Sequence, residues 1–345
     1  MQPTRAPRSY AALAFPHSRD SFGAADAERW AAEKTVASLN VAQREAQMKI
    51  IVLSLIVLVL SGCSSLQDRS AAAPVVKRMS VNGTVITYLE QGQGTPVVFV
   101  HGAYSDHRLW EPQREVVARR YRFIALDQRY FGTAPWTDSG SQYSQETHVA
   151  DLAAFIRELK VGPVYVVGRS YGSGNALAMA VRYPELVRGL FLNEPPLLTI
   201  VPDPAERKSA AADLKDRVAV SALAKAGKAV EATRLFHDWL NDQPGGFDAL
   251  APASMAMHLD NARTVPLHMV APPPQPTTCT QVGTLKVPIT ITRGELTRPF
   301  FKILAEATSR CIPGSQLIVI KGGRHGSPNQ QPESFNEALL AFLAR

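Results

Sequence analysis

The sequence has 345 residues, of which 46% are hydrophobic and 19% are charged, and its formal net charge is +7. This balance is typical of a globular protein with a large core and excludes a disordered or fibrous chain. The lysines and arginines form no run of five or more, so the charge predicts solubility and no nucleic-acid partner. The three cysteines, Cys63, Cys279 and Cys311, form no C-x-x-C pair, and no metal site is expected.

A short apolar run, residues 50–60, lies between Met48 and Cys63. Eleven residues are too few to span a bilayer comfortably, which takes about 20, but they match the apolar region of a signal peptide. The final "LSGC" resembles a bacterial lipobox. It predicts a signal peptide over 48–62, lipidation of Cys63, and a lipid-anchored protein of the bacterial cell envelope with the membrane as a partner. A buried strand or helix is the alternative interpretation of this run.

The segments on either side of this run follow from the signal-peptide interpretation. Residues 63–74 are polar and are expected to form a tether. A signal peptide should begin near the N-terminus, so residues 1–47 are interpreted as a non-native or disordered extension from an upstream start. An Arg-rich organellar transit peptide is the alternative.

From Val75 onward, apolar runs of strand length alternate with helical patterns. Strands are expected at residues 81–89, 95–100, 121–127, 161–168, 187–194, 287–292 and 315–323. Helices are expected at residues 109–119, 146–159, 176–182, 298–309 and 334–343. This alternation predicts an α/β fold with a mostly parallel central sheet that helices cover on both faces.

One segment breaks the alternation and divides the predicted core into residues 75–196 and 285–345. Within residues 197–284, helices are expected at 204–226, 228–240 and 253–263, and a Pro-rich return follows them. We interpret 197–284 as an inserted helical lid.

The remaining cysteines lie near one end of the expected sheet. Cys279 precedes the strand 287–292, and Cys311 follows a helix that runs back toward the start of that strand. A cell-envelope location would permit a disulfide between them. The sequence nevertheless favours two unpaired thiols.

The stretch 168–172, "GRSYG", is a G-x-S-x-G between an expected buried strand and an expected helix. This is the context that a nucleophile elbow requires, in which a sharp turn projects the serine hydroxyl above the sheet. Gly168 and Gly172 are needed there because side chains would collide with the neighbouring strand and helix. The helix N-terminus adds backbone N–H groups and a positive dipole end. Ser170 is therefore predicted to be a nucleophile.

Two further motifs appear in the order found in one large family. His101-Gly102-Ala103 follows an expected strand, and His325 follows the last one. With the serine motif, they make the chain from Val75 onward resemble the α/β-hydrolase superfamily. The resemblance implies that His325 is the base and that the backbone N–H groups of Ala103 and Tyr171 form the oxyanion hole. His101 is interpreted as a structural member of its loop.

The acid that would orient His325 departs from the family's commonest pattern. "RGELTRP" puts Thr297 where most members carry an aspartate. Two carboxylates compete for the role, Glu194 at the end of the strand after the serine and Glu295 beside Gly294. Some superfamily members take their acid from the former position, so Glu194 is the predicted acid and Glu295 the second choice.

A serine at the elbow argues against haloalkane dehalogenases and epoxide hydrolases of this fold, which need an aspartate there. The residues predict a cofactor-free, carboxylesterase-like serine hydrolase that cleaves an ester or related acyl bond of a small, apolar substrate through an acyl-enzyme. The alternative is a non-catalytic lipoprotein of the same fold that binds a ligand or a partner. The exact substrate and the oligomeric state stay open.

Overall fold

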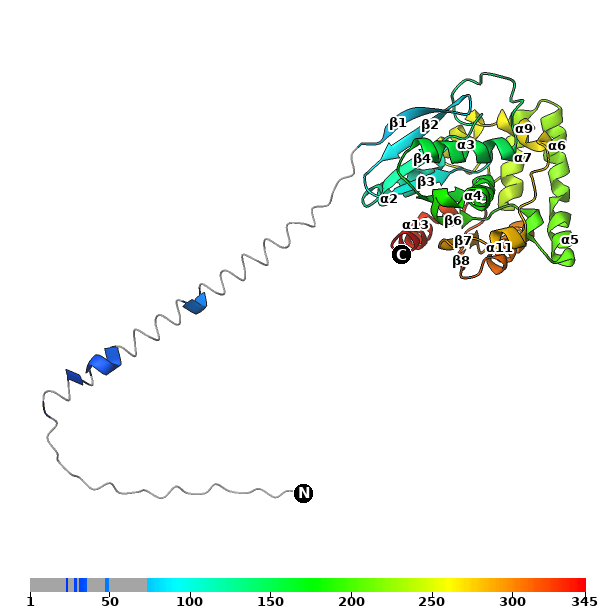
Figure 1. Ribbon diagram of the computed structural model, residues 1–345. Helices are drawn as coiled ribbons and strands as arrows, with labels where there is room; N and C mark the ends of the chain where they lie inside the picture. The colour runs from blue at the N-terminus through cyan, green and yellow to red at the C-terminus, as the bar shows by residue number, and fades with distance from the viewer. Residues whose placement is uncertain (1–22, 24–27, 30, 36–46, 50–72) are drawn as a thin grey trace, which may run out of the picture. The chain divides into compact units, whose positions relative to one another are not determined.

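A computed structural model of the chain describes residues 23, 28–29, 31–35, 47–49 and 73–345 (Figure 1). Contacts divide the chain into two units, residues 1–69 and 70–345, and only the second is considered below. The predicted extension, signal peptide and tether fall almost wholly outside the described residues, and Cys63 lies outside them. Among the described residues, no helix combines the length and apolarity that crossing a membrane requires.

Eight strands form one sheet in the order β1-β2-β4-β3-β5-β6-β7-β8 (Figure 1). The strands are β1 (Val75–Val81), β2 (Thr84–Gln91), β3 (Pro96–Val100), β4 (Arg122–Leu126), β5 (Val164–Arg169), β6 (Val187–Asn193), β7 (Ile289–Gly294) and β8 (Gln316–Ile320). The pairs β1–β2 and β2–β4 are antiparallel, and every other neighbouring pair is parallel. The mostly parallel sheet predicted from the alternation is therefore confirmed.

The first two strands correct the predicted single strand at 81–89. They form a hairpin that turns at Asn82-Gly83, with register from Val75 opposite Glu90 to Val81 opposite Thr84. Asn82 and Gly83 both have positive φ, +45° and +73°, as Asn-Gly hairpin turns require. Most of β1 is exposed, so it lacks the apolar alternation that would mark it as a strand.

Helices cover both faces of the sheet. They are α2 (Glu111–Ala118), α3 (Gln145–Glu158), α4 (Tyr171–Arg182), α11 (Pro299–Cys311) and α13 (Pro332–Leu343). The two faces of the sheet carry two hydrophobic cores, and successive residues of β3 point into different ones. Val98 packs in the core with α3, α4 and α11, and Phe99 packs in the core with α2 and α13. This period of two is that of a strand buried on both faces. Short 3-10 or α segments lie at His107–Trp110, Pro184–Leu186, Leu198–Ile200 and Ser327–Gln330.

The chain between β6 and β7 is helical, as predicted, but it is divided more finely. Its helices are α5 (Pro204–Asp213), α6 (Arg217–Lys225), α7 (Ala229–Asn241), α8 (Pro252–Asp260), α9 (Thr264–Val270) and α10 (Cys279–Val282). The single helix predicted at 204–226 is wrong, because a 3-10 turn at Leu214–Asp216 separates α5 from α6. Arg298 donates to Asp213 at this break, from Nε at 3.1 Å and from Nη2 at 2.8 Å, and so ties the turn to the core. The helices α9 and α10 were missed because they span seven and four residues.

A disulfide joins Cys279 to Cys311, contrary to the two unpaired thiols that the sequence favoured. Cys279 begins α10 and Cys311 ends α11, and their Cα atoms lie 5.0 Å apart, within the range that a disulfide bridges. The cysteines are 32 residues apart in sequence, so only the tertiary packing of α10 on α11 brings them together.

Candidate active site

Ser170 occupies the turn between the end of β5 and the start of α4. Its backbone has φ of +52° and ψ of −120°, a region that non-glycine residues rarely adopt. A Cβ atom on Gly172 would lie 2.3 Å from the carbonyl oxygen of Val100, and one on Gly168 would lie 2.7 Å from the Cα of Ser173. The backbone therefore passes too close to its neighbours for a side chain at either glycine. This close packing holds the strained turn that presents Ser170.

His325 lies in the turn after β8 and is almost fully buried. Its Nδ1 lies 2.5 Å from Oε2 of Glu194, and the ring of Phe301 stacks on the imidazole with centroids 3.9 Å apart. Burial lowers the pKa of His325; Glu194 opposes this through its hydrogen bond and charge, and the charge of Arg169 adds to the lowering. The net pKa is below the usual value, which favours the neutral imidazole.

Glu194, and not Glu295, contacts the histidine. Glu194 directly follows β6 and is fully buried, with a positive φ of +49°. Its Oε1 accepts a hydrogen bond from the backbone N–H of Gly294 at 2.8 Å. Its Oε2 accepts one from the hydroxyl of Thr297 at 3.0 Å in addition to the contact with His325. Glu295 is exposed and accepts from the backbone N–H of Gly322 at 2.9 Å.

The part played by Thr297 was missed by the sequence reasoning, which treated it only as a missing acid. It stands at the position where most superfamily members carry an aspartate, and its hydroxyl supports the carboxylate that approaches from the neighbouring strand. The threonine and Glu194 thus meet at the same point from β7 and β6. The signal available in the sequence was that Thr297 occupies the usual position of the aspartate, while the carboxylate of Glu194 follows a different strand.

The predicted oxyanion residues lie beside the serine. Ala103 and Tyr171 line the same cavity as Ser170, and a Cβ on Gly102 would lie 3.4 Å from the Cβ of Ser170. The Tyr171 hydroxyl donates to Nδ1 of His148 at 2.7 Å, which fixes this side chain against α3.

His101 stabilises the loop that carries Ala103 rather than facing Ser170. Its ring Nδ1 lies 2.8 Å from the carbonyl oxygen of Gly102, and its Nε2 accepts from the backbone N–H of Gln128 at 3.0 Å. Both ring nitrogens are therefore occupied. Burial lowers the pKa of His101, so the ring is neutral.

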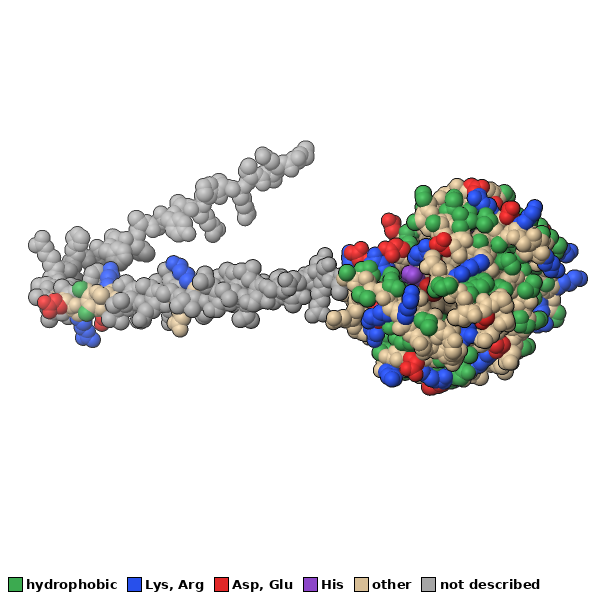
Figure 2. All heavy atoms as spheres, turned by 90° about the horizontal axis from the view of Figure 1, so that it is seen from above, with side chains coloured by type: hydrophobic (Ala, Val, Ile, Leu, Met, Phe, Trp, Pro, Cys, Tyr) green, Lys and Arg blue, Asp and Glu red, His purple; other side chains and the backbone are tan. Residues whose placement is uncertain are grey.

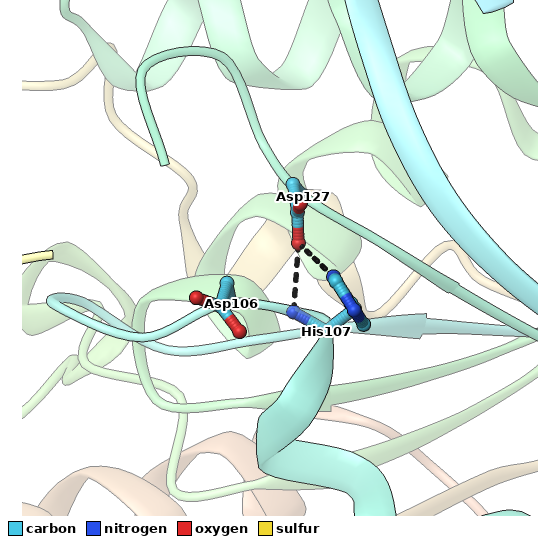
Figure 3. Close-up of side chains that lie close together, drawn as sticks. All are labelled: Asp106, His107 and Asp127. Carbon is cyan, nitrogen blue, oxygen red and sulfur yellow. Dashed lines mark hydrogen bonds and ion pairs between the residues drawn. The ribbon is translucent and has the colours of Figure 1, made fainter. Parts of the chain in front are cut away.

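Three side chains after this loop form a compact cluster: Asp106, His107 and Asp127 (Figure 3). Figure 3 shows that Asp127 accepts from both the backbone N–H and the ring Nδ1 of His107, at 2.8 and 2.7 Å. Asp106 accepts instead from Arg108 Nη2 at 2.6 Å and from Asn261 Nδ2 at 2.7 Å. Each member already has partners in the protein, and the cluster ties this loop to β4 and to the end of α8.

A cavity of about 280 Å³ opens above Ser170. Its wall is mostly apolar and comes from the helical insertion and from α11; it includes Pro196, Leu197, Phe236, Trp239, Leu240, Ala271, Pro272, Pro273, Pro274, Phe300 and Phe301. Polar side chains on the wall are Gln145, Arg217 and His268 besides Ser170 and Tyr171. Burial lowers the pKa of His268 to about 3, so Arg217 carries the only charge on this wall.

A second, much smaller cavity also borders the serine. Ser170, His325 and Arg169 line it together with Gly102, Ala103, Tyr104 and Leu240. Arg169 is buried, and its Nε has no hydrogen-bond partner among the described residues. The sequence did not single out either arginine, because Arg169 occupies a variable position of the G-x-S-x-G motif and Arg217 lies outside every motif.

The fold and this arrangement define a hydrolase of the α/β class. The model of the family described as alpha/beta hydrolase fold matches residues 95–326, and the chain belongs to this family.

Among curated proteins, the chain is similar to the 2-(acetamidomethylene)succinate hydrolase of Mesorhizobium japonicum, with 27% identity over 78% of this chain and 95% of the relative. It is also 33% identical to the 2-hydroxy-6-oxo-6-(2'-aminophenyl)hexa-2,4-dienoic acid hydrolase of Metapseudomonas resinovorans over 39% of this chain and 47% of the relative. Among solved structures, a serine hydrolase involved in carbazole degradation shares the fold, with a TM-score of 0.61, 23% identity and coverage of 79% of this chain and 99% of that one.

Proposed function

We propose that the protein is a cofactor-free serine hydrolase that cleaves an ester or related acyl bond of a small molecule through an acyl-enzyme. The observation that carries the proposal is the 2.5 Å contact between Glu194 Oε2 and His325 Nδ1, together with the small cavity that His325 and Ser170 both line. This supports a Ser-His-Glu triad, in which Ser170 is the nucleophile, His325 the base and Glu194 the acid.

Each step follows from the groups around the serine. His325 has Nδ1 engaged by Glu194, so Nε2 is the nitrogen that takes the proton of Ser170 as its Oγ attacks the carbonyl carbon. The backbone N–H groups of Ala103 and Tyr171 stabilise the negative oxygen of the tetrahedral intermediate, an effect worth about 3 kcal/mol for one donor. His325 then gives the proton to the leaving group. In the second half of the reaction, His325 takes a proton from water, the water attacks the acyl-enzyme, and the proton returns to Ser170 as the acid product leaves.

The substrate is expected to be small, because the cavity has a volume of about 280 Å³. Its acyl or leaving part is expected to be largely apolar, because aromatic and proline side chains form most of the wall. The helical insertion supplies Arg217, Phe236, Trp239 and His268 to that wall, which supports its role as a lid that sets specificity. The two curated relatives are named as hydrolases of small organic acids, which supports a small-molecule substrate here.

Labelling with a fluorophosphonate probe tests the proposed nucleophile. Wild-type protein is expected to be labelled, and Ser170→Ala is expected to lose the label. Ser173→Ala is the matched control, because this serine lies on α4 and donates its hydroxyl to the carbonyl of Asn193 at 2.9 Å. Absence of labelling in the folded wild-type protein would favour a non-catalytic binding protein.

We also propose that the protein is exported to the bacterial cell envelope and anchored there through lipid on Cys63. The apolar run before Cys63 supports a signal peptide. The disulfide between Cys279 and Cys311 supports an oxidising compartment, where such bonds form and persist.

A further inference from the structure

Arg217 is the first residue of α6, and it brings a positive charge to the wall of the apolar cavity above Ser170. Its guanidinium lies over the rings of Phe236 and Trp239, 5.5 and 5.6 Å from their centroids. Among the described residues, its buried Nε has no hydrogen-bond partner, and its Nη2 contacts only the weakly accepting Sδ of Met269 at 3.7 Å. Within residues 73–345, no carboxylate forms an ion pair with it.

The carboxylates nearest in sequence serve a different arginine. Asp213 and Asp216 both bind Arg298, at 2.8 and 3.4 Å, and Asp242 binds it as well at 3.4 Å. Arg298 also lies over the ring of Trp239, 4.8 Å from its centroid. Two arginines thus stack on one tryptophan, yet only the arginine outside the cavity wall is neutralised.

A partly buried cation without a counter-ion costs free energy that a bound ligand can compensate. Burial lowers the pKa of Arg217, which expresses the same cost. A guanidinium presents a planar fork of donors that matches a carboxylate, and stacking on aromatic rings leaves the edge of that fork free.

We propose that Arg217 binds a carboxylate of the substrate, so that the substrates are esters, thioesters or amides that carry a second, ionised carboxyl group several bonds from the scissile carbonyl. Ser170 and Arg217 line the same cavity, and the apolar wall between them suits the chain that joins the two groups. The position of the scissile bond rests on the proposed serine hydrolase activity; the carboxylate site does not.

Matched pairs of ethyl esters test the proposal by turnover. Monoethyl succinate, glutarate and adipate are compared with ethyl butanoate, pentanoate and hexanoate, and released ethanol is measured in every case. For at least one chain length, kcat/KM for the acid-bearing ester is expected to be about tenfold or more higher than for its neutral partner, and this ratio is compared between variants. Arg217→Gln should abolish that preference, and Arg217→Lys should keep part of it because the charge stays while the planar fork is lost.

Lys225→Gln is the matched control, because it removes one positive charge from the exposed end of the same helix. It should leave the ratio unchanged. An equal ratio in wild-type protein and Arg217→Gln, or the absence of any preference across the three chain lengths, would overturn the proposal. If Arg217 had only a structural role, Arg217→Gln would lower the melting temperature without changing the ratio.

Equilibrium binding separates this proposal from the proposed hydrolase activity. Calorimetry with Ser170→Ala is expected to detect the three monoethyl diacids and to lose about tenfold or more in affinity when Arg217→Gln is added. If no ester is hydrolysed but this binding difference is present, the carboxylate site stands and the hydrolase activity fails. If neutral esters are hydrolysed and the binding difference is absent, the reverse holds.

Discussion

Ser170 and Glu194 both have positive φ, +52° and +49°, and each directly follows a parallel strand. Such conformations are costly for residues with a side chain and persist where the surrounding packing determines them. The neighbouring strands β5 and β6 end at the same edge of the sheet, so the two turns aim both side chains at the space that His325 enters. The backbone strain is therefore concentrated at the proposed reacting groups.

The choice of acid is open to a direct kinetic test. Glu194→Gln is expected to lower kcat by about 10²- to 10⁴-fold, because the amide cannot stabilise the imidazolium by charge. Glu295→Gln is the matched control and should stay within a few-fold of wild type, since Glu295 is exposed and bonds only to the Gly322 backbone. Hydrolysis rates of one ester substrate by both variants decide the matter, and a larger loss in Glu295→Gln would refute the assignment.

The pH dependence follows from the surroundings of His325. Its neutral form is the proposed base, and burial holds the pKa of His325 below its usual value of about 6.5. We therefore expect kcat/KM to rise with pH on the acid side and to reach half its plateau below pH about 6.5. Because the charge of Arg169 also lowers the pKa of His325, Arg169→Met should shift this midpoint to higher pH. An unchanged or lower midpoint in Arg169→Met would contradict the electrostatic role.

At the scale of elements, α10 and α11 show how the helical insertion is fixed to the core. The disulfide links the end of the insertion to α11, the helix that carries Phe300 and Phe301, and both of these residues belong to the cavity wall. Phe301 also stacks on His325. The covalent link therefore supports the helix that forms part of the cavity wall and contacts His325.

Removal of this disulfide should destabilise the protein. The double variant Cys279→Ser, Cys311→Ser is expected to lose about 2–4 kcal/mol in its free energy of unfolding, as is usual when a native disulfide is removed. Urea denaturation of residues 73–345 with and without a reducing agent measures the effect. The reductant should destabilise wild type and leave the double variant unchanged; equal stability of oxidised and reduced wild type would argue against the bond.

At the scale of the whole molecule, the charge is distributed rather than concentrated on the face that Figure 2 shows. Basic and acidic side chains are interspersed over that face of the folded unit (Figure 2). No patch of a single sign dominates that face. This distribution agrees with the scattered lysines and arginines of the sequence.

The proposed anchor predicts where the protein is found in a bacterial host. Expression of the full sequence should yield a membrane-bound protein whose N-terminal peptide begins at a diacylglyceryl-modified Cys63. Cys63→Ser should shift the protein away from the membrane fraction, because the lipid supplies the anchor. Ser64→Ala is a neighbouring control that should leave membrane binding unchanged. Mass spectrometry that recovers intact peptides from residues 1–47 would instead exclude translation from Met48.

The sequence by itself determined the parallel sheet, the places of its buried strands and the positions of Ser170 and His325 relative to them. These features are local: an apolar strand of five or six residues, a glycine-flanked serine and a histidine after the last strand are each read within a short window. The hairpin at Asn82-Gly83 was local as well, but the exposed residues of β1 gave it no apolar pattern.

The tertiary structure decided the features that depend on distant residues. Glu194 meets His325 across 131 residues of sequence, and the disulfide spans 32. Nothing in the sequence distinguishes Arg217 from the other arginines; only the packing of the described residues places it on the cavity wall with an unpaired Nε. Spacing cannot supply such pairings, because each depends on how the ends of separate strands and helices pack together in the folded chain.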